Sequence, residues 1–298
     1  MGQTFGEQQD HKLKEGLVDK TSKTVLGIDI GGTKIKAGRV LGKDVVQSSL
    51  SKVNPDDSEE TSLSKLCKTI DEVMMDTVEA IGIGVPAVVD PDSGVVYDVQ
   101  NIPSWKKVPL KELVQKQFNV PVYLNNDANC FALGEKHFGK AKQYTNCVAL
   151  SLGTGLGMGI IIDNKLYNGV LCGAGEVGML PYKNGILEQY AGSFFFEEEY
   201  GESAKVLYQK ALDNNETALS AFRHYGVHLG EALKAILYLF APESIILGGS
   251  ISNAYPFFKA SLQEAIDSFA YQKQLENFKI ETSDLVDSPI LGAAALCL

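Results

Sequence analysis

The chain has 298 residues, enough for two domains of ordinary size, and its hydrophobic content of 45% is typical of a globular protein. Its net charge of -10, from 27 basic and 37 acidic residues, argues against nucleic acid as the main ligand, because that binding relies on Lys and Arg to neutralise phosphates. Five scattered cysteines and the lack of a secretory leader predict reduced thiols and a cytoplasmic protein. No apolar run reaches the roughly 20 residues that span a bilayer, so no membrane association is expected.

The chain begins with a polar stretch and then a series of apolar strands. Residues 1–23 show no periodicity, which predicts a flexible N-terminal arm. From Thr24 the pattern indicates a strand and then a turn at Gly31-Gly32. Two further strands at residues 35–40 and 45–50 suggest an antiparallel arrangement, and a helix at residues 63–74 and a buried strand at residues 80–85 follow. The two glycines offer unusual dihedral angles and room for backbone N–H groups to approach an anion. A plain hairpin turn explains the same pair about equally well.

A strand-to-helix junction follows in the middle of the chain. Helical spacing over residues 110–118 precedes a strand at residues 120–124, which runs into Asn125-Asn-Asp-Ala-Asn129. Apolar residues from Ala128 onward begin another helix, so the carboxylate of Asp127 should lie beside a helix N-terminus, where its ionised form is favoured.

The second half repeats the opening pattern. A strand at residues 147–152 leads into a run of four alternate glycines, Gly153 to Gly159, which we expect to form a turn before a partner strand at residues 158–162. Helices are predicted over residues 187–200 and 217–240, and a strand at residues 244–247 ends at Gly248-Gly249. Strands alternating with helices imply an α/β protein, and two glycine turns suggest one nucleotide site split between two halves.

Four motifs, taken in order, resemble those of the ROK family of sugar kinases from about Thr24 to the C-terminus. They are Asp29-Ile-Gly-Gly-Thr33, Asn126-Asp-Ala-Asn129, Gly153-Thr-Gly155 and Leu247-Gly-Gly-Ser250. The resemblance implies a two-domain actin-like ATPase (ribonuclease H-like) fold with a cleft between the domains. We expect a small N-terminal α/β domain at residues 24–124, completed by residues 284–298, and a larger one at residues 125–283.

The resemblance also implies that both glycine turns hold the phosphates of ATP. The residues concerned are Gly31, Gly32, Thr33 and Lys34 in the first turn, Gly153, Thr154 and Gly155 in the second, and Gly248 and Gly249 as a wall of the nucleotide site. Asp29 would face the magnesium ion, bound to it directly or through a water molecule. Backbone N–H groups and a cation with oxygen ligands are the parts that phosphoryl transfer requires.

For the acceptor sugar, the resemblance implies a base and a set of hydroxyl-binding side chains. Asp127 matches the general base, although a plain helix N-cap is the competing interpretation. Asn101 and Asn126 match positions that bind sugar hydroxyls, a task that suits an amide because it both donates and accepts. Glu176 and Glu188 match positions near the anomeric carbon, and an exposed helix glutamate is the alternative for Glu188.

The chain departs from the family pattern after Glu176. Met179 stands where relatives carry His, and residues 180–190 contain none of the cysteines of the family's zinc knuckle, so no zinc is expected. Of the four histidines, His137, His224 and His228 lie in helical contexts, which favours surface or packing roles.

The function implied is an ATP-dependent kinase of glucokinase type, acting on a hexose 6-hydroxyl with Asp127 as base, with Mg²⁺, in a homodimer. Other acceptors remain open, namely an N-acetylated hexosamine or a β-glucoside, as does polyphosphate as donor, since Pro86-Ala-Val-Val89 with Asn101 and Trp105 is similar to polyphosphate glucokinases. A non-catalytic, sugar-responsive regulator is a further alternative. We expect it less, because the 23 residues before the first strand are too few for a helix-turn-helix and the chain is acidic.

Overall fold

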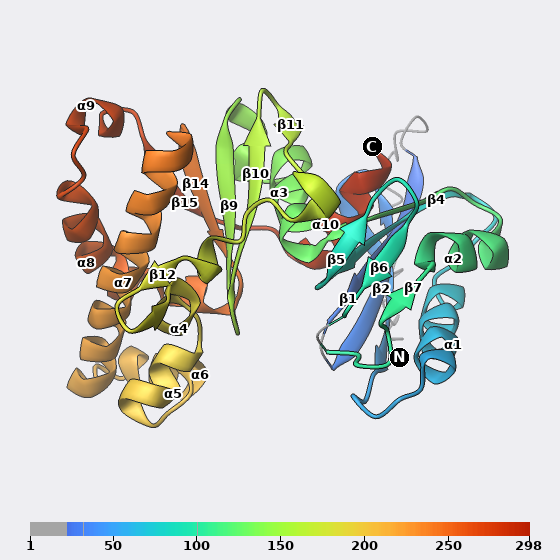
Figure 1. The fold of residues 1–298 in the computed structure, drawn as a ribbon, viewed down its shortest axis with the longest axis horizontal. Coiled ribbons are helices and arrows are strands. Elements are labelled where there is room, and N and C mark those ends of the chain that lie inside the picture. Colours follow the sequence, from blue (N-terminus) through green and yellow to red (C-terminus); the bar gives the residue numbers. More distant parts are fainter. Residues whose placement is uncertain (1–22, 32, 100) are drawn as a thin grey trace, which may run out of the picture.

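Two five-stranded sheets stand side by side in the computed structural model, which describes residues 23–31, 33–99 and 101–298 (Figure 1). Two helices, α3 (Asp127–His137) and α10 (Ser288–Ala294), lie between the sheets. The arm expected at residues 1–23 falls outside the described residues except for Lys23, as does Gly32 with its predicted phosphate contact. Among the helices of the described ranges, none is long and apolar enough to cross a membrane.

The first sheet has the strand order β3-β2-β1-β4-β8. Its antiparallel part consists of β1 (Thr24–Ile30), β2 (Lys34–Leu41) and β3 (Asp44–Lys52), which confirms the predicted antiparallel beginning. Parallel to β1 run β4 (Val78–Val85) and β8 (Val122–Asn126). One face packs against α1 (Glu59–Asp71), α2 (Leu110–Phe118) and a small sheet of β5 (Val88–Asp90), β6 (Val95–Tyr97) and β7 (Lys107–Val108). The patterns of the sequence did not predict this small sheet.

The second sheet repeats the topology of the first, in the order β11-β10-β9-β14-β15. Its strands are β9 (Cys147–Leu152), β10 (Leu156–Ile162), β11 (Lys165–Leu166), β14 (Ser244–Gly248) and β15 (Lys279–Thr282). Here too a central strand has antiparallel neighbours on one side and parallel ones on the other, so the predicted likeness of the two halves is confirmed.

The glycine-rich turn is shorter than predicted. Because β10 begins at Leu156, only Gly153 to Gly155 form the turn, and Gly157 and Gly159 are strand residues. A side chain at Gly159 would come within 2.5 Å of Ala132 Cβ and of the Ala128 carbonyl oxygen on α3. The glycine at position 159 therefore serves the close packing of α3 on β10.

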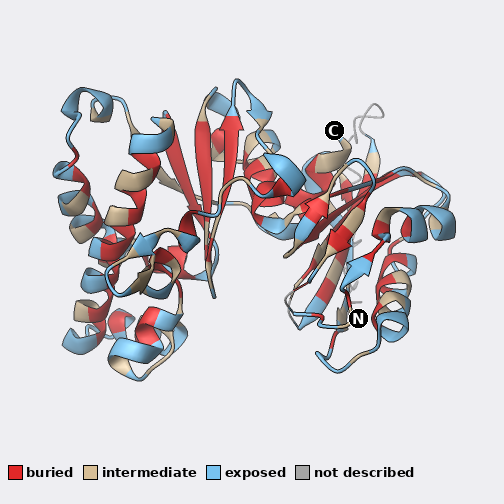
Figure 2. Ribbon diagram, viewed as in Figure 1, coloured by how far each residue is buried: buried red, intermediate tan, exposed pale blue. Residues whose placement is uncertain are grey.

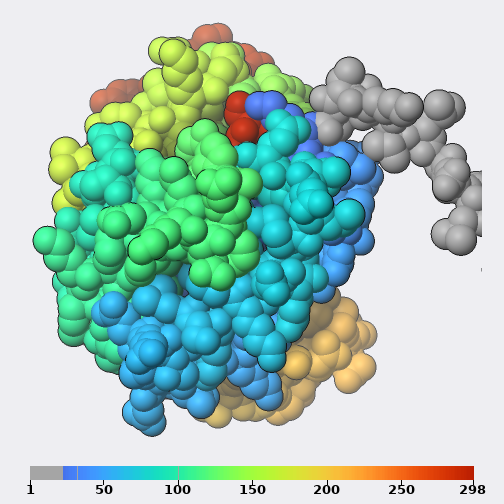
Figure 3. Space-filling view, turned by 90° about the vertical axis from the view of Figure 1, so that its right-hand side faces the viewer, coloured from blue at the N-terminus to red at the C-terminus, as the bar shows by residue number. Residues whose placement is uncertain are grey.

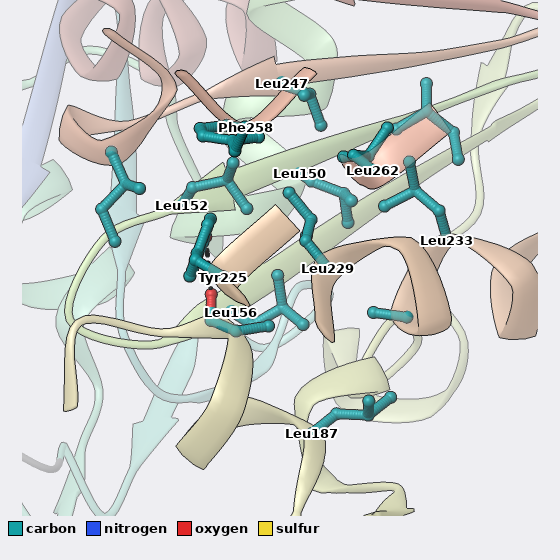
Figure 4. Packing of buried hydrophobic residues seen from close by; sticks show 14 of the residues in the cluster. Leu150, Leu152, Leu156, Leu187, Tyr225, Leu229, Leu233, Leu247, Phe258 and Leu262 are labelled. Atoms are coloured by element: carbon teal, nitrogen blue, oxygen red, sulfur yellow. Dashed lines mark hydrogen bonds between the residues drawn. The ribbon is translucent and has the colours of Figure 1, made fainter. Parts of the chain in front are cut away.

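The outer face of the second sheet is covered by two long helices. Leu150, Leu152 and Leu247 of the sheet meet Tyr225 and Phe258, among others, from α7 (Glu216–Phe240) and α8 (Tyr255–Asp267) (Figure 4). The helix predicted over residues 187–200 is interrupted at Gly192 and Ser193, giving two helices instead of one. The remaining elements are α4 (Leu187–Ala191), α5 (Phe194–Tyr200), α6 (Ala204–Leu212), α9 (Gln272–Leu275), β12 (Pro181–Tyr182), β13 (Gly185–Ile186) and the 3₁₀ turns η1 (Lys140–Gln143), η2 (Val170–Cys172), η3 (Val177–Met179), η4 (Ser250–Ala254) and η5 (Ala295–Cys297).

Burial is concentrated in the central strands and in the helix faces turned toward them (Figure 2). Along β1 the side chains alternate: Leu26 and Ile28 join the core beneath α1 and α2, while Val25 packs with α10 on the opposite face. Viewed from the side of the first sheet, residues of the first half of the chain form most of the surface, residues of the second half border it above and below, and the last residues of the chain emerge near its upper edge (Figure 3).

Helix α10 approaches the first sheet closely because glycines face it. An added Cβ at Gly27 of β1 would overlap the carbonyl oxygen of Ile290, and one at Gly82 of β4 would overlap that of Ala293. On the other side, an added Cβ at Gly134 of α3 would lie 2.9 Å from the Cα of Gly292. The predicted boundary at residues 124 and 125 falls inside β8, and the residue ranges of the two domains stay a prediction.

Candidate functional site

Two carboxylates meet at the carboxyl ends of the parallel strands. Asp29 pairs in register with Gly84 of β4, and Gly84 pairs with Asn125 of β8, two residues before Asp127. Asp29 is on the same face of β1 as Gly27, the face that α10 covers. An added Cβ at Gly84 would lie 3.7 Å from the Cα of Asp127. The same Cβ would lie 3.2 Å from Cys130 Sγ, so the absence of a side chain at Gly84 lets the first turn of α3, with Asp127, pack close to β4.

The two aspartates influence each other electrostatically. Burial, together with the negative charge of Asp127, raises the pKa of Asp29 to about 6 against the opposing effect of Lys34 and Lys36. Burial also raises the pKa of Asp127, partly offset by hydrogen bonds from the backbone N–H groups of Ala128 and of Asp127 itself. The side chain of Asp127 nevertheless retains an exposed surface, so it is accessible to a reactant.

This pair fits a magnesium ion that arrives with a nucleotide. A divalent cation near Asp29 would relieve the repulsion between the two carboxylates. Within the described part of the chain no group of three or more Asp, Glu, His or Cys residues is arranged to hold a metal ion. Mg²⁺ in kinases needs only one or two carboxylates, because phosphate oxygens and water supply its other ligands.

The helix cap at this junction is Asn126 and not Asp127. Asn126 has extended backbone angles, and its side chain accepts a hydrogen bond of 2.9 Å from the N–H of Ala128, as an N-cap does. Asp127 is the first residue inside α3, and its Oδ1 accepts from the same N–H at 2.9 Å. Since Asn126 provides the cap, the competing interpretation of Asp127 as a plain N-cap is wrong.

Two glutamates approach this region from the second half of the chain. Glu188 on α4 accepts a hydrogen bond of 2.9 Å from the N–H of Leu156, at the start of β10. It is half-buried, so it is not the exposed helix glutamate of the alternative interpretation. Burial raises the pKa of Glu176, and the negative charges of Glu188 and Asp127 raise it further. Glu188 and Asp127 therefore each lie close enough to Glu176 to repel its carboxylate. Met179, in the turn after Glu176, is exposed.

The second glycine turn is held by the link between α4 and α5. The N–H of Ser193 donates to the carbonyl oxygen of Gly153 at 2.9 Å, and Thr154 at the tip is exposed. An added Cβ at Gly155 would overlap the carboxylate of Glu188. A side chain at position 155 would therefore displace the Glu188 carboxylate from its hydrogen bond with Leu156.

The first glycine turn is closed by a hydrogen bond of 2.9 Å from the N–H of Gly31 to the carbonyl oxygen of Lys34. Thr33 and Lys34 are exposed. Gly31 is not among the glycines with a positive φ, and the unusual dihedral angles expected for the glycine pair stay a prediction. Gly32 lies outside the described residues.

Gly248 and Gly249 end β14 beside the second glycine turn, since Gly248 pairs with Ser151 of β9. Gly249 has a φ of 81°, and an added Cβ there would overlap the backbone of Leu152. An added Cβ at Gly248 would overlap the ring of Phe131 on α3. Both positions therefore require glycine for reasons of shape.

Some predicted site residues are not brought together. Within residues 23–31, 33–99 and 101–298, no hydrogen bond joins the turn that ends at Lys34 to the turn at Gly153. Asn101 is exposed in the turn between β6 and β7. The neighbouring Trp105 is fully buried in the core of the first half and donates from Nε1 to Ser62 Oγ at 2.7 Å.

Sequence patterns missed two residues that contact the Asp127 junction. Asn168 accepts a hydrogen bond from Asn125, 43 residues earlier, and the carbonyl oxygen of Cys172 lies 3.4 Å from Asn129 Nδ2. Both are in an irregular segment between β11 and η3, and no local periodicity or motif marks them.

An aromatic cluster occupies the region where the resemblance implied a zinc knuckle in relatives. Tyr182 hydrogen-bonds with its hydroxyl to Nδ1 of His228 over 3.0 Å, and Tyr190 and Phe195 pack around the same imidazole. Lys183 lies over the rings of Tyr182 and Tyr190. The predicted packing role of His228 is confirmed, and this cluster joins the β12–β13 hairpin to α7.

The histidine of this cluster should make stability sensitive to acid. Burial, with the positive charge of Lys183, lowers the pKa of His228 from 6.5 to about 4. Between these values the unfolded chain binds more protons at this site than the native state, so stability falls as the pH drops through that window. From pH 7 to about pH 5 the free energy of unfolding of the wild type should fall. In His228→Gln we expect this fall to be about 2 kcal/mol smaller, as measured by urea unfolding at both pH values. His224→Gln, at an exposed position on the same helix, is the control, and an equal change in both variants would contradict the assignment.

Comparisons with known proteins identify the family and the fold of the chain. A family model described as ROK family matches residues 25–298. The xylose repressor of Bacillus spizizenii is 33% identical over 234 residues, which cover 73% of this chain and 60% of the repressor. The chain thus spans about 60% of the length of the xylose repressors that it matches first.

Two sugar kinases match over nearly their full length. The glucokinase of Thermotoga maritima is 30% identical over 314 residues, 91% of this chain and 96% of that protein. The structure of a ROK family glucokinase from Streptomyces griseus in complex with glucose and AMPPNP is similar with a TM-score of 0.75 and 27% identity, covering 92% of this chain and 98% of that one. The predicted two-domain actin-like ATPase fold is confirmed by this likeness.

Proposed function

Because the chain belongs to the ROK family, we propose that it is a sugar kinase that transfers the terminal phosphoryl group of ATP to a hexose 6-hydroxyl. The observation that carries the proposal is the pair Asp29 and Asp127, which meet on one face of the first sheet across Gly84. One carboxylate near a cation and another that is exposed to a reactant are what this reaction requires.

Asp127 is proposed as the general base. Its raised pKa brings the carboxylate closer to the operating pH, which favours proton transfer from a hydroxyl. Asn126 caps α3 with its side-chain oxygen, so its Nδ2 remains available to a sugar hydroxyl. We propose Asn101, Glu176 and Glu188 as further contacts to the sugar.

The nucleotide is proposed to bind between the two glycine turns. ATP supplies the phosphoryl group, and Mg²⁺ held near Asp29 neutralises the charge on its phosphates. The residues proposed to contact the nucleotide are Gly31, Gly32, Thr33 and Lys34 of the first glycine turn, Gly153, Thr154 and Gly155 of the second, and Gly248 and Gly249 at the end of β14. The complex of the Streptomyces griseus glucokinase with AMPPNP supports a nucleoside triphosphate as the donor. A cytoplasmic homodimer stays a prediction.

A sugar-responsive regulator is the second candidate, because the xylose repressors are 32–33% identical to this chain. The Asp29–Asp127 pair favours the kinase, since binding a sugar does not by itself require two carboxylates that repel each other.

A phosphorylation screen tests the proposal. Glucose, mannose, N-acetylglucosamine, N-acetylmannosamine and a β-glucoside are each incubated with ATP or polyphosphate and Mg²⁺, and the sugar phosphate is detected directly. We expect turnover with glucose and ATP. Turnover only with polyphosphate would show that polyphosphate, and not ATP, is the phosphoryl donor. Sugar binding without turnover of any of the acceptors would favour the regulator.

A further inference from the structure

A segment of the second half crosses to the first sheet and returns. This strap, residues 167–175, lies between β11 and η3. Its η2 turn packs against β5, and the side chain of Cys172 is buried in the core beneath α1 and α2. The next residue along the chain is Glu176. The strap thus connects the core of the first sheet to a carboxylate of the candidate sugar site.

Three asparagines join the strap to the junction that carries Asp127. Asn125 Nδ2 donates to Asn168 Oδ1 on the strap, and Asn129 Nδ2 donates to Asn125 Oδ1, each over 2.9 Å. Asn125 Oδ1 also accepts from the backbone N–H of Asn126 at 2.9 Å, directly before Asp127. Asn129 Nδ2 is 3.4 Å from the carbonyl oxygen of Cys172. One network therefore holds the backbone on both sides of Asp127.

This network is not arranged for maximal stability. Asn129 is fully buried, and its Oδ1 has no hydrogen-bond partner among the described residues, which costs about 1–3 kcal/mol. Leu171 and Cys172 have φ angles of 53° and 59°, a conformation that costs about 1–3 kcal/mol for a residue other than glycine. Such costs persist where the surrounding structure imposes them, and they cluster at functional sites.

We propose that the strap and Asn129 position the Asp127 carboxylate relative to Glu176, which makes Asn129 a positioning residue for the reaction. The proposal rests on the proposed kinase function for its catalytic consequence. A catalytic group that is misplaced by about 1 Å loses on the order of 100-fold in rate, so the network can control the chemical step without touching the substrate.

Two matched substitutions separate the donor and acceptor roles in the network. In Asn129→Asp the side chain has at most one O–H and cannot donate to both Asn125 Oδ1 and the Cys172 carbonyl oxygen. In Asn168→Asp the carboxylate still accepts from Asn125 Nδ2. We expect Asn129→Asp to lower kcat by about 10- to 100-fold with little change in the KM for ATP, and Asn168→Asp to stay close to the wild type.

Three results would overturn the proposal. These are a folded Asn129→Asp protein with wild-type kcat, equal losses in Asn129→Asp and Asn168→Asp, or an unchanged kcat with a raised KM for ATP. If Asn129→Asp does not fold, Asn168→Ala removes the acceptor from a half-buried loop position. Its kcat should fall while Asn168→Asp restores it, and equal values in the two variants would also refute the proposal.

Hydrogen exchange tests the coupling without turnover. Backbone amides of residues 125–130 and 168–172 should exchange faster in Asn129→Asp than in the wild type, and Asn168→Asp should not differ. If the wild type phosphorylates no sugar, the proposed function fails, but the exchange measurement still tests the strap. Unchanged exchange in Asn129→Asp would show that the strap does not hold the Asp127 junction.

Discussion

Asp127→Asn is expected to reduce phosphoryl transfer by about 100- to 10,000-fold, the contribution of a general base, while sugar binding persists. The amide has nearly the shape of the carboxylate but cannot take up the proton of the attacking hydroxyl. Because Asn126 caps α3, the helix should keep its N-terminal hydrogen bond in the variant. The measurements are the rate of sugar phosphate formation and, separately, sugar affinity by calorimetry.

The matched control is Asp163→Asn, the same change at an exposed turn position with a φ of 50°, where asparagine is readily accommodated. It should behave as the wild type. An unchanged rate in Asp127→Asn would refute the base assignment. A loss of sugar affinity as large as the loss in rate would place Asp127 in binding and not in proton transfer.

Gly82→Ala should produce the largest loss of stability. A Cβ at this position overlaps the carbonyl oxygen of Ala293, and a backbone atom of α10 has no rotamer by which to escape. We expect the free energy of unfolding to fall by about 3 kcal/mol, since overpacking forces the backbone to shift. For a chain of this size that corresponds to a lower Tm by roughly 5–10 °C, measured by thermal unfolding.

Gly153→Ala provides the comparison for this effect. An added Cβ at Gly153 meets no atom within 4 Å, so its Tm should remain close to the wild-type value whatever happens to activity. If Gly82→Ala is as stable as Gly153→Ala, α10 can move away from β4, and the close packing of this helix on the first sheet is not required for the fold.

Local patterns predicted the elements that carry the candidate site. β1 ends at Ile30, one residue after Asp29, and β8 ends at Asn126, directly before Asp127. Both strands are short, and their apolar residues lead into glycine or asparagine, a pattern that predicts a strand and its end. The long helix α7 was predicted almost to the residue, because its apolar positions recur at helical spacing and Pro242 follows its end.

The elements that the sequence did not predict depend on distant partners. The small sheet of β5, β6 and β7 has strands of two or three residues, too short for any periodicity to appear. Helix α10 has seven residues, five of them buried between the first sheet and α3, so no polar face marks it as a helix. In the sequence, Gly157 and Gly159 resemble turn residues. In the structure they lie in β10, and the close contact with α3 explains why these strand positions are glycines.

The sequence by itself determined where the strands beside the candidate site lie, and therefore the α/β class, the repeated halves and the candidates Asp29 and Asp127. These follow from spacing and from the conformations that short segments allow. Only the tertiary structure decided that Asp29 and Asp127 face each other across Gly84, that Asn126 is the cap, that Glu188 contacts β10, and that a strap from the second half holds the Asp127 junction. Each of these depends on packing between segments far apart in the chain, and no local pattern encodes such a contact.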